Sequence, residues 1–173
     1  EMLEDWEKLP LDQQQSFWKQ SLELLAAEGK TDLFLLAKHV LGYQQVAEQP
    51  HREICEFIEN WNNGKRKKMM LLGRGTFKTT ICSISYPIQQ LLVNPNIRIL
   101  IASETQHLSL AILGSIKRHL EGERFKSFYG DLVSDKGWRD NEITIKTRSD
   151  KALKEPTVGC MGIDTARTGS HWD

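Results

Sequence analysis

Apolar residues recur at helical spacing over roughly the first 60 residues of the chain. The pattern predicts one helix over about 12–28, a second over about 32–40 and a third over about 50–61. Gly29 lies directly after the first of these, where a glycine often ends a helix. We therefore expect residues 1–48 to form an N-terminal helical region that precedes the main domain.

The spacing changes near residue 69. Residues 69–72 and 97–102 are short, almost wholly apolar runs, which are typical of buried parallel strands. Helical patterns over 78–93 and about 104–120 follow them, and Pro87 is expected to kink or split the first. The order strand, helix, strand, helix predicts an α/β fold with a parallel sheet flanked by helices. Further strands are expected over 142–146 and 157–162.

The connection between the first apolar run and the next helix reads Gly73-Arg74-Gly75-Thr76-Phe77-Lys78-Thr79-Thr80. A phosphate-binding loop, or P-loop, needs backbone N–H groups that wrap around phosphate oxygens, a lysine that reaches the β- and γ-phosphates, and a hydroxyl for Mg²⁺. Lys78 is the candidate lysine and Thr79 is the candidate Mg²⁺ ligand. The following helix would direct its positive end at the phosphates.

This segment departs from the usual pattern G-x-x-x-x-G-K-[ST] at two positions. Phe77 stands where the glycine before the lysine is expected, and Leu72 stands where the first glycine is expected. The alternative is a strand–loop–helix turn with an incidental lysine. The strand before the loop and the helix after it favour the P-loop.

Arg74-Gly75 and Lys78-Thr79 resemble the R-G-x-x-K-[ST] form of the Walker A segment in large terminase subunits, the DNA-packaging ATPases of tailed bacteriophages. Residues 91–103, with their Asn-Pro turn, resemble the helix, turn and second strand of that family. Residues 166–173 resemble the segment before its Walker B strand. The resemblance covers about 35–173 and implies a P-loop domain of the ASCE or RecA-like class over 49–173, truncated before Walker B.

The resemblance also implies roles for individual residues. Arg74 would contact the γ-phosphate or couple hydrolysis to movement. His51 and Arg52 stand where the family has its adenine-binding motif, although His51 is equally read as a helix N-terminal residue that contacts backbone or solvent. Arg148 and Arg167 are candidate arginine fingers, and exposed, solvated arginines are the alternative. The candidate catalytic residues are therefore Lys78, Arg74 and Arg167, and the candidate ATP-binding residues are Gly73, Arg74, Gly75, Thr76, Phe77, Lys78, Thr79, Thr80, His51 and Arg52.

The function implied by the resemblance is ATP- and Mg²⁺-dependent translocation of double-stranded DNA into a procapsid in the cytoplasm of a bacterial host. The expected partners are DNA, a portal, a small terminase subunit and further copies of the chain in a ring. The chain alone is expected to hydrolyse ATP weakly or not at all, because the Walker B acids are absent. The alternatives are another nucleic-acid-stimulated translocase of helicase type and a non-catalytic assembly module.

Composition adds limits to this interpretation. The 173 residues carry 23 basic and 23 acidic side chains, so net charge gives no argument for nucleic-acid binding. The dense basic run Lys65-Arg66-Lys67-Lys68 could touch DNA or could mark the solvated end of a strand. The run that ends at Asp164 is an alternative, weaker Walker B candidate. The three cysteines lie in apolar runs and are expected to be buried, and no apolar stretch approaches the length of a membrane helix.

Overall fold

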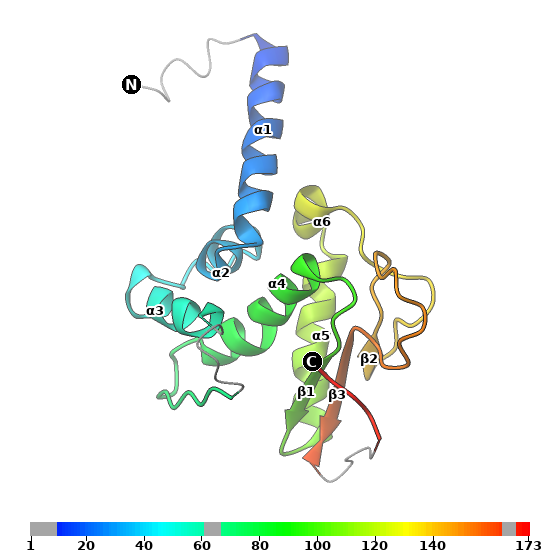
Figure 1. Cartoon of the computed structure of the whole chain (residues 1–173). Helices are drawn as coiled ribbons and strands as arrows, with labels where there is room; N and C mark the ends of the chain where they lie inside the picture. Colours follow the sequence, from blue (N-terminus) through cyan, green and yellow to red (C-terminus); the bar gives the residue numbers. More distant parts are fainter. Residues whose placement is uncertain (1–9, 61–66, 164–168) are drawn as a thin grey trace.

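The computed structural model describes residues 10–60, 67–163 and 169–173, and this part of the chain is an α/β structure (Figure 1). Two of its helices begin or end in π-helical turns, η2 and η3. The helical elements are α1 (Leu11–Gly29), α2 (Leu33–Leu35) with η2 (Leu36–Val40), α3 (Glu48–Glu59), η3 (Thr79–Ser85) with α4 (Tyr86–Val93), α5 (Gln106–Glu121) and α6 (Glu123–Tyr129). The strands are β1 (Ile99–Ser103), β2 (Glu142–Ile143) and β3 (Val158–Gly162).

The three strands form one sheet in the order β1-β3-β2. β1 and β3 are parallel, with Ile101 opposite Cys160, whereas β2 is antiparallel to β3. The α/β class is thus confirmed, but the sheet is mixed and not wholly parallel as expected. The reason lies in the connection from β2 to β3, which contains no helix. A parallel return normally needs a long, usually helical, crossover.

The apolar run 69–72 does not form the expected strand. It is extended, and its side chains alternate: Met69 and Leu71 are 80% and 83% exposed, whereas Met70 and Leu72 pack partly against the core. No strand within the described residues pairs with it. An apolar run becomes a ladder strand only when a neighbour accepts its backbone hydrogen bonds, and here only one side-chain face is covered.

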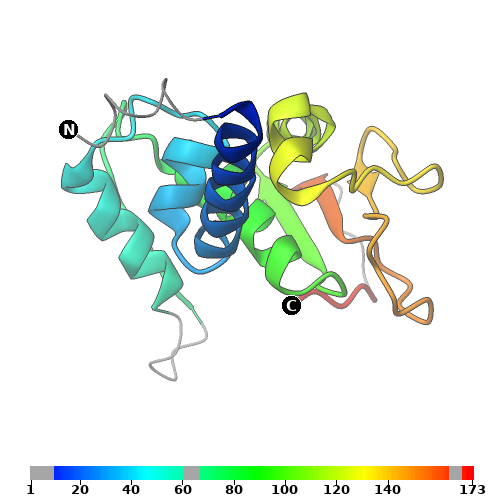
Figure 2. The same ribbon diagram turned by 90° about the horizontal axis from the view of Figure 1, so that it is seen from above.

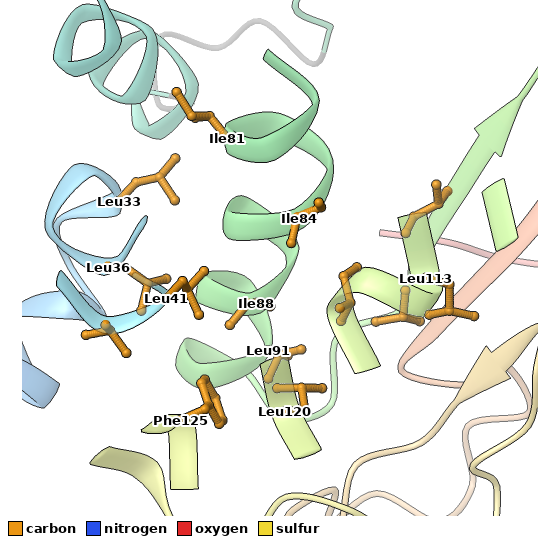
Figure 3. Close-up of a cluster of buried hydrophobic side chains, with 14 of the residues drawn as sticks. Leu33, Leu36, Leu41, Ile81, Ile84, Ile88, Leu91, Leu113, Leu120 and Phe125 are labelled. Carbon is orange, nitrogen blue, oxygen red and sulfur yellow. The ribbon is translucent and has the colours of Figure 1, made fainter. Parts of the chain in front are cut away.

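The hydrophobic core joins the N-terminal helical region to the rest of the chain. Leu33 and Leu36 lie in the same buried cluster as Ile88 of α4 and Leu113 of α5 (Figure 3). Residues of the expected region 1–48 therefore pack into the main body from Leu33 onward. α1 instead projects from it (Figure 1), and its buried residues, Ala26 and Gly29, lie near its C-terminal end.

The helix after the loop divides where the sequence suggested. Its π-helical turn η3 gives way to α4 at Tyr86, immediately before Pro87. Proline lacks the backbone N–H that a continuous α-helix needs at that position, so the change of hydrogen-bond register there has a local cause.

The cysteines are free, with Cys55 and Cys160 buried and Cys82 half-buried. Burial raises the pKa of the Cys55 thiol to about 12, so it is protonated and behaves as a small apolar side chain. Among the described helices, none has the length and apolar character that crossing a bilayer requires.

Candidate functional site

Residues 73–78 form a tight turn between the extended segment 67–72 and η3. Gly75 has a φ of 80°, and the Thr76 hydroxyl donates a hydrogen bond to the Gly73 carbonyl at 2.9 Å. Phe77 has a φ of 51°, in the left-handed region that favours glycine. The conformation at Phe77 is therefore the one that a glycine would adopt most easily, at the position where the P-loop pattern has glycine.

Lys78 folds back across the start of this turn. Its Nζ donates hydrogen bonds to the Leu72 carbonyl at 3.1 Å and to the Gly73 carbonyl at 2.9 Å. The ammonium group is thus held over the loop by two backbone oxygens. The ammonium group of Lys78 therefore lies at the turn itself and is not directed away from it into solvent.

The helix begins directly at the loop. The backbone N–H of Ile81 bonds to the Phe77 carbonyl at 2.9 Å, so the amides of Lys78, Thr79 and Thr80 precede the first bonded turn. Helix-starting amides have no acceptor in their own helix and give this end a partial positive charge. A Cβ atom placed on Gly73 or Gly75 would meet no atom within 4 Å, so the loop is open to a ligand.

The structure brings His51 to the same loop. Its ring lies edge-on to the Phe77 ring, with 5.4 Å between centroids and 80° between planes. His51 is 7% exposed, and its Nδ1 accepts a hydrogen bond from the Ala47 amide at 3.0 Å. The start of α3 therefore lies beside residue 77. His51 contacts backbone, as the alternative interpretation of this residue has it, and its role in adenine binding stays a prediction.

Arg52 faces the N-terminal helices. Its Nε donates to Glu48 at 2.6 Å, its Nη1 lies 3.4 Å from Asp32, and its guanidinium stacks 4.2 Å from the centroid of the Phe34 ring. The bond from Arg52 lowers the pKa of the Glu48 carboxyl group. These contacts join α3 to α2, and they leave Arg52 with a structural role in this arrangement.

The other candidates are distributed more widely. Arg74 is exposed, and within residues 10–60, 67–163 and 169–173 it has no hydrogen-bond or ion-pair partner. Thr79 is exposed at a cavity of about 400 Å³ that it shares with Ser103, at the end of β1, and with α5. The segment that contains Arg148, drawn in orange, lies at the opposite end of the molecule from the loop (Figures 1 and 2). Arg167 and Asp164 lie outside the described residues.

Two further observations bear on metal and DNA binding. No group of three or more His, Cys, Asp or Glu side chains in the described parts is arranged to hold a metal ion, so a Mg²⁺ ion here would rely on the Thr79 hydroxyl and on the phosphates themselves. In the basic run, Lys68 donates to the carbonyls of Phe57 and Ile58 at the end of α3. Lys68 thus caps a helix, while Lys65 and Arg66 lie outside the described residues.

Sequence reasoning singled out the loop, Lys78 and His51 as candidates, but it did not predict the contact between the rings of His51 and Phe77. Phe77 breaks the motif, so the pattern counts it as a defect, although its ring is what meets His51. Comparison of the chain with protein-family models, with curated proteins and with solved structures finds no significant match.

Proposed function

We propose that this chain is the nucleotide-binding part of a P-loop ATPase. The observation that carries the proposal is the position of Lys78, whose ammonium group is folded over a tight turn at the start of a helix. Left-handed backbone at Gly75 and Phe77 makes that turn possible. Few other uses account for a lysine, open space and unbonded helix-start amides at one place.

Each residue of the loop has a part in holding Mg²⁺·ATP. The Lys78 ammonium would leave the carbonyls of Leu72 and Gly73 and bind the terminal phosphates, and the helix-start amides would donate to phosphate oxygens. The Thr79 hydroxyl would bind the metal ion. The bound nucleotide supplies the phosphoanhydride bond that hydrolysis breaks. Arg74 is exposed beside the loop and is free to approach the γ-phosphate.

We further propose that the ATPase is a DNA-packaging motor of the large-terminase type, acting on double-stranded DNA with a portal, a small subunit and other copies of the chain. The support is the ordered set of motifs: the R-G-x-x-K-T loop, the Asn-Pro turn and the strand after it. That turn precedes β1 in the structure, where the Asn96 amide bonds to the Asn94 side chain at 3.0 Å. The location would then be the cytoplasm of an infected bacterium.

The test is nucleotide binding by the single-residue variant K78A. A fluorescent ATP analogue carrying a methylanthraniloyl group, added with Mg²⁺, should bind the wild-type chain and should bind K78A at least about tenfold more weakly, because the ammonium–phosphate contact is lost. K19A is the matched control, since Lys19 is an exposed lysine on α1. Equal affinity of K78A and K19A for the analogue would show that the loop is not a phosphate loop.

A non-catalytic assembly module is the second candidate, and Phe77 in the glycine position favours it. The two candidate functions predict different nucleotide binding by the wild-type chain. A module with a decayed loop binds neither the ATP analogue nor Mg²⁺·ADP, whereas an ATPase domain binds both. A helicase-type translocase would bind them as well, and it is distinguished by unwinding of duplex DNA by the complete protein.

A further inference from the structure

The loop that connects β2 to β3 is fixed at both sides of Arg148. The Asn96 side chain accepts hydrogen bonds from the backbone amides of Ser149 at 3.1 Å and Asp150 at 3.0 Å. On the other side, the Lys146 amide bonds to the Leu132 carbonyl at 2.9 Å. Hydrogen bonds to distant segments therefore set the position of Arg148, although no regular secondary structure contains it.

The guanidinium group of Arg148 has two buried donors without acceptors. Its Nε and Nη2 atoms are shielded from solvent, and neither has a hydrogen-bond partner among the described residues. These two donors lie on the same edge of the guanidinium plane, which binds an oxyanion through two parallel hydrogen bonds. Burial lowers the pKa of Arg148, as expected for a cation that has lost water without gaining a full partner.

A second arginine, Arg98, uses the same edge of its guanidinium group, Nε and Nη2, to bind a carboxylate. Arg98 donates from Nε to one Asp173 oxygen at 3.0 Å and from Nη2 to the other at 2.7 Å. The carboxylate thus accepts from both donors on this edge of Arg98, whereas the same two donors of Arg148 have no acceptor among the described residues. Buried polar donors are nearly always bonded in folded proteins, so the two unpaired donors of Arg148 point to a ligand.

Arg148 lines a cavity of about 550 Å³ together with four lysines and the four carboxylates of Asp135, Glu142, Asp150 and Glu155. The Asp150 carboxylate accepts a hydrogen bond from the Ala152 amide at 2.9 Å. Glu142 pairs with Arg139 at 2.8 Å, and Glu155 accepts a hydrogen bond from the His171 amide at 3.0 Å. The lysines around the cavity have no ion pair within the described residues. They are Lys136, Lys146, Lys151 and Lys154.

We propose that this cavity binds a phosphate group, and that the Arg148 side chain turns out of the cavity wall to receive it through Nε and Nη2. Phosphate is favoured over a carboxylate because the lining has five basic side chains against four carboxylates, and three of those carboxylates already accept hydrogen bonds from other groups of the protein. The site is separate from the loop at Lys78, since the two lie at opposite ends of the molecule (Figure 2). The phosphate is either a free ion or part of a nucleic-acid backbone.

Thermal unfolding in inorganic phosphate tests the site. The K78A variant serves as the background, so that the loop contributes nothing. About 10 mM phosphate, compared with sodium chloride at equal ionic strength, should raise the melting temperature by about 2–5 °C in K78A and leave K78A/R148Q unchanged. K78A/R118Q is the matched control, because Arg118 is an exposed arginine on α5, and it should keep the full shift.

The conservative variant R148K separates phosphate binding from loss of folding. It keeps the charge but lacks the bidentate edge, so K78A/R148K should unfold cooperatively and keep less than half of the shift. A phosphate shift in K78A/R148Q and K78A/R148K equal to that in K78A/R118Q would overturn the proposal. Absence of any shift in K78A itself would do the same.

Binding of a fluorescently labelled DNA duplex identifies the source of the phosphate. If the site receives a backbone phosphate, R148Q should weaken DNA binding at least about fivefold and R118Q should not. If R148Q removes the phosphate shift but leaves DNA binding unchanged, the ligand is a free phosphate. Both results support the phosphate site.

Discussion

Two substitutions at position 77 test the conformation of the loop, because the structure predicts which of the two variants is more stable. Phe77 has a φ of 51°, and a residue with a Cβ atom is disfavoured there by about 1–2 kcal/mol. F77A keeps the Cβ atom and therefore keeps this strain, whereas F77G removes it. Both variants lose the edge-on contact with His51, which is worth about 0.5–1.5 kcal/mol and cancels when they are compared.

The expected difference follows from two opposing terms. Glycine relieves about 1–2 kcal/mol of strain, but it is more flexible in the unfolded chain and loses about 0.5–1 kcal/mol relative to alanine. F77G should therefore be more stable than F77A by about 0.75 kcal/mol, which is the difference between the middle values of the two ranges. At a position with ordinary backbone angles the order would be reversed, so the sign of the difference is decisive.

Urea unfolding followed by circular dichroism measures this difference directly, and the two melting temperatures should differ by a few degrees. If F77A proves as stable as F77G, or more stable, residue 77 does not have left-handed backbone angles. The tight turn formed by residues 73–78 would then be refuted as well. F77G should also keep the affinity of the wild-type chain for the fluorescent ATP analogue, because it restores the residue that the P-loop pattern has there.

Two other predictions concern the packing around α5. His119 accepts or donates a 2.7 Å hydrogen bond with the Tyr43 hydroxyl, and burial lowers its pKa, so the unfolded chain takes up a proton first as the pH falls below about 6.5. The free energy of unfolding should fall from about pH 7 to about pH 5, and urea titrations of H119Q should show a smaller fall; an unchanged slope would exclude His119 as its source. A Cβ atom at Gly162 would lie 2.7 Å from the Gln106 amide nitrogen, so G162A should destabilise by about 1–3 kcal/mol. A Cβ atom at Gly114, within α5, would meet no atom within 4 Å, so G114A should instead raise the free energy of unfolding by about 0.5–1 kcal/mol. The packing argument would be contradicted if urea denaturation showed that both substitutions stabilise the protein or that both destabilise it.

Five helical segments were predictable because their apolar spacing and end signals are local, whereas the short helix α6 (Glu123–Tyr129) was not anticipated. The helix after the loop even changes register at Tyr86, beside Pro87, where a missing N–H demands it. β1 and β3 were also anticipated to within about two residues, since short buried apolar runs bounded by turns have few other uses. The antiparallel pairing of β2 was not anticipated, because strand direction depends on how the chain returns and not on the strand residues.

The run 69–72 shows the limit of the same reasoning. Its composition is that of a buried strand, yet Leu71 is 83% exposed because no described strand lies beside it. A run of apolar residues indicates which side chains a segment can bury. A strand also needs a neighbouring strand to accept its backbone hydrogen bonds, and the apolar pattern does not show whether one is present. The charged residues show a similar limit: Arg52 and Lys68, candidates for ligand contacts, are engaged with other parts of the fold.

The loop and the cavity at Arg148 differ in a way that bears on the proposed motor. At the loop, the Lys78 ammonium is held by carbonyls of Leu72 and Gly73, so a nucleotide must displace two hydrogen bonds before it binds. At the cavity, the Arg148 donors have no such competitor among the described residues, and Asn96 already holds the adjacent backbone. The backbone that carries Arg148 is therefore ordered in advance, which reduces the entropic cost of binding, although the shielded Nε and Nη2 atoms reach a ligand only when the side chain turns. Phosphate should therefore bind at Arg148 with a turn of that side chain and no change of backbone, whereas nucleotide binding should be accompanied by movement of the Lys78 side chain away from the carbonyls of Leu72 and Gly73.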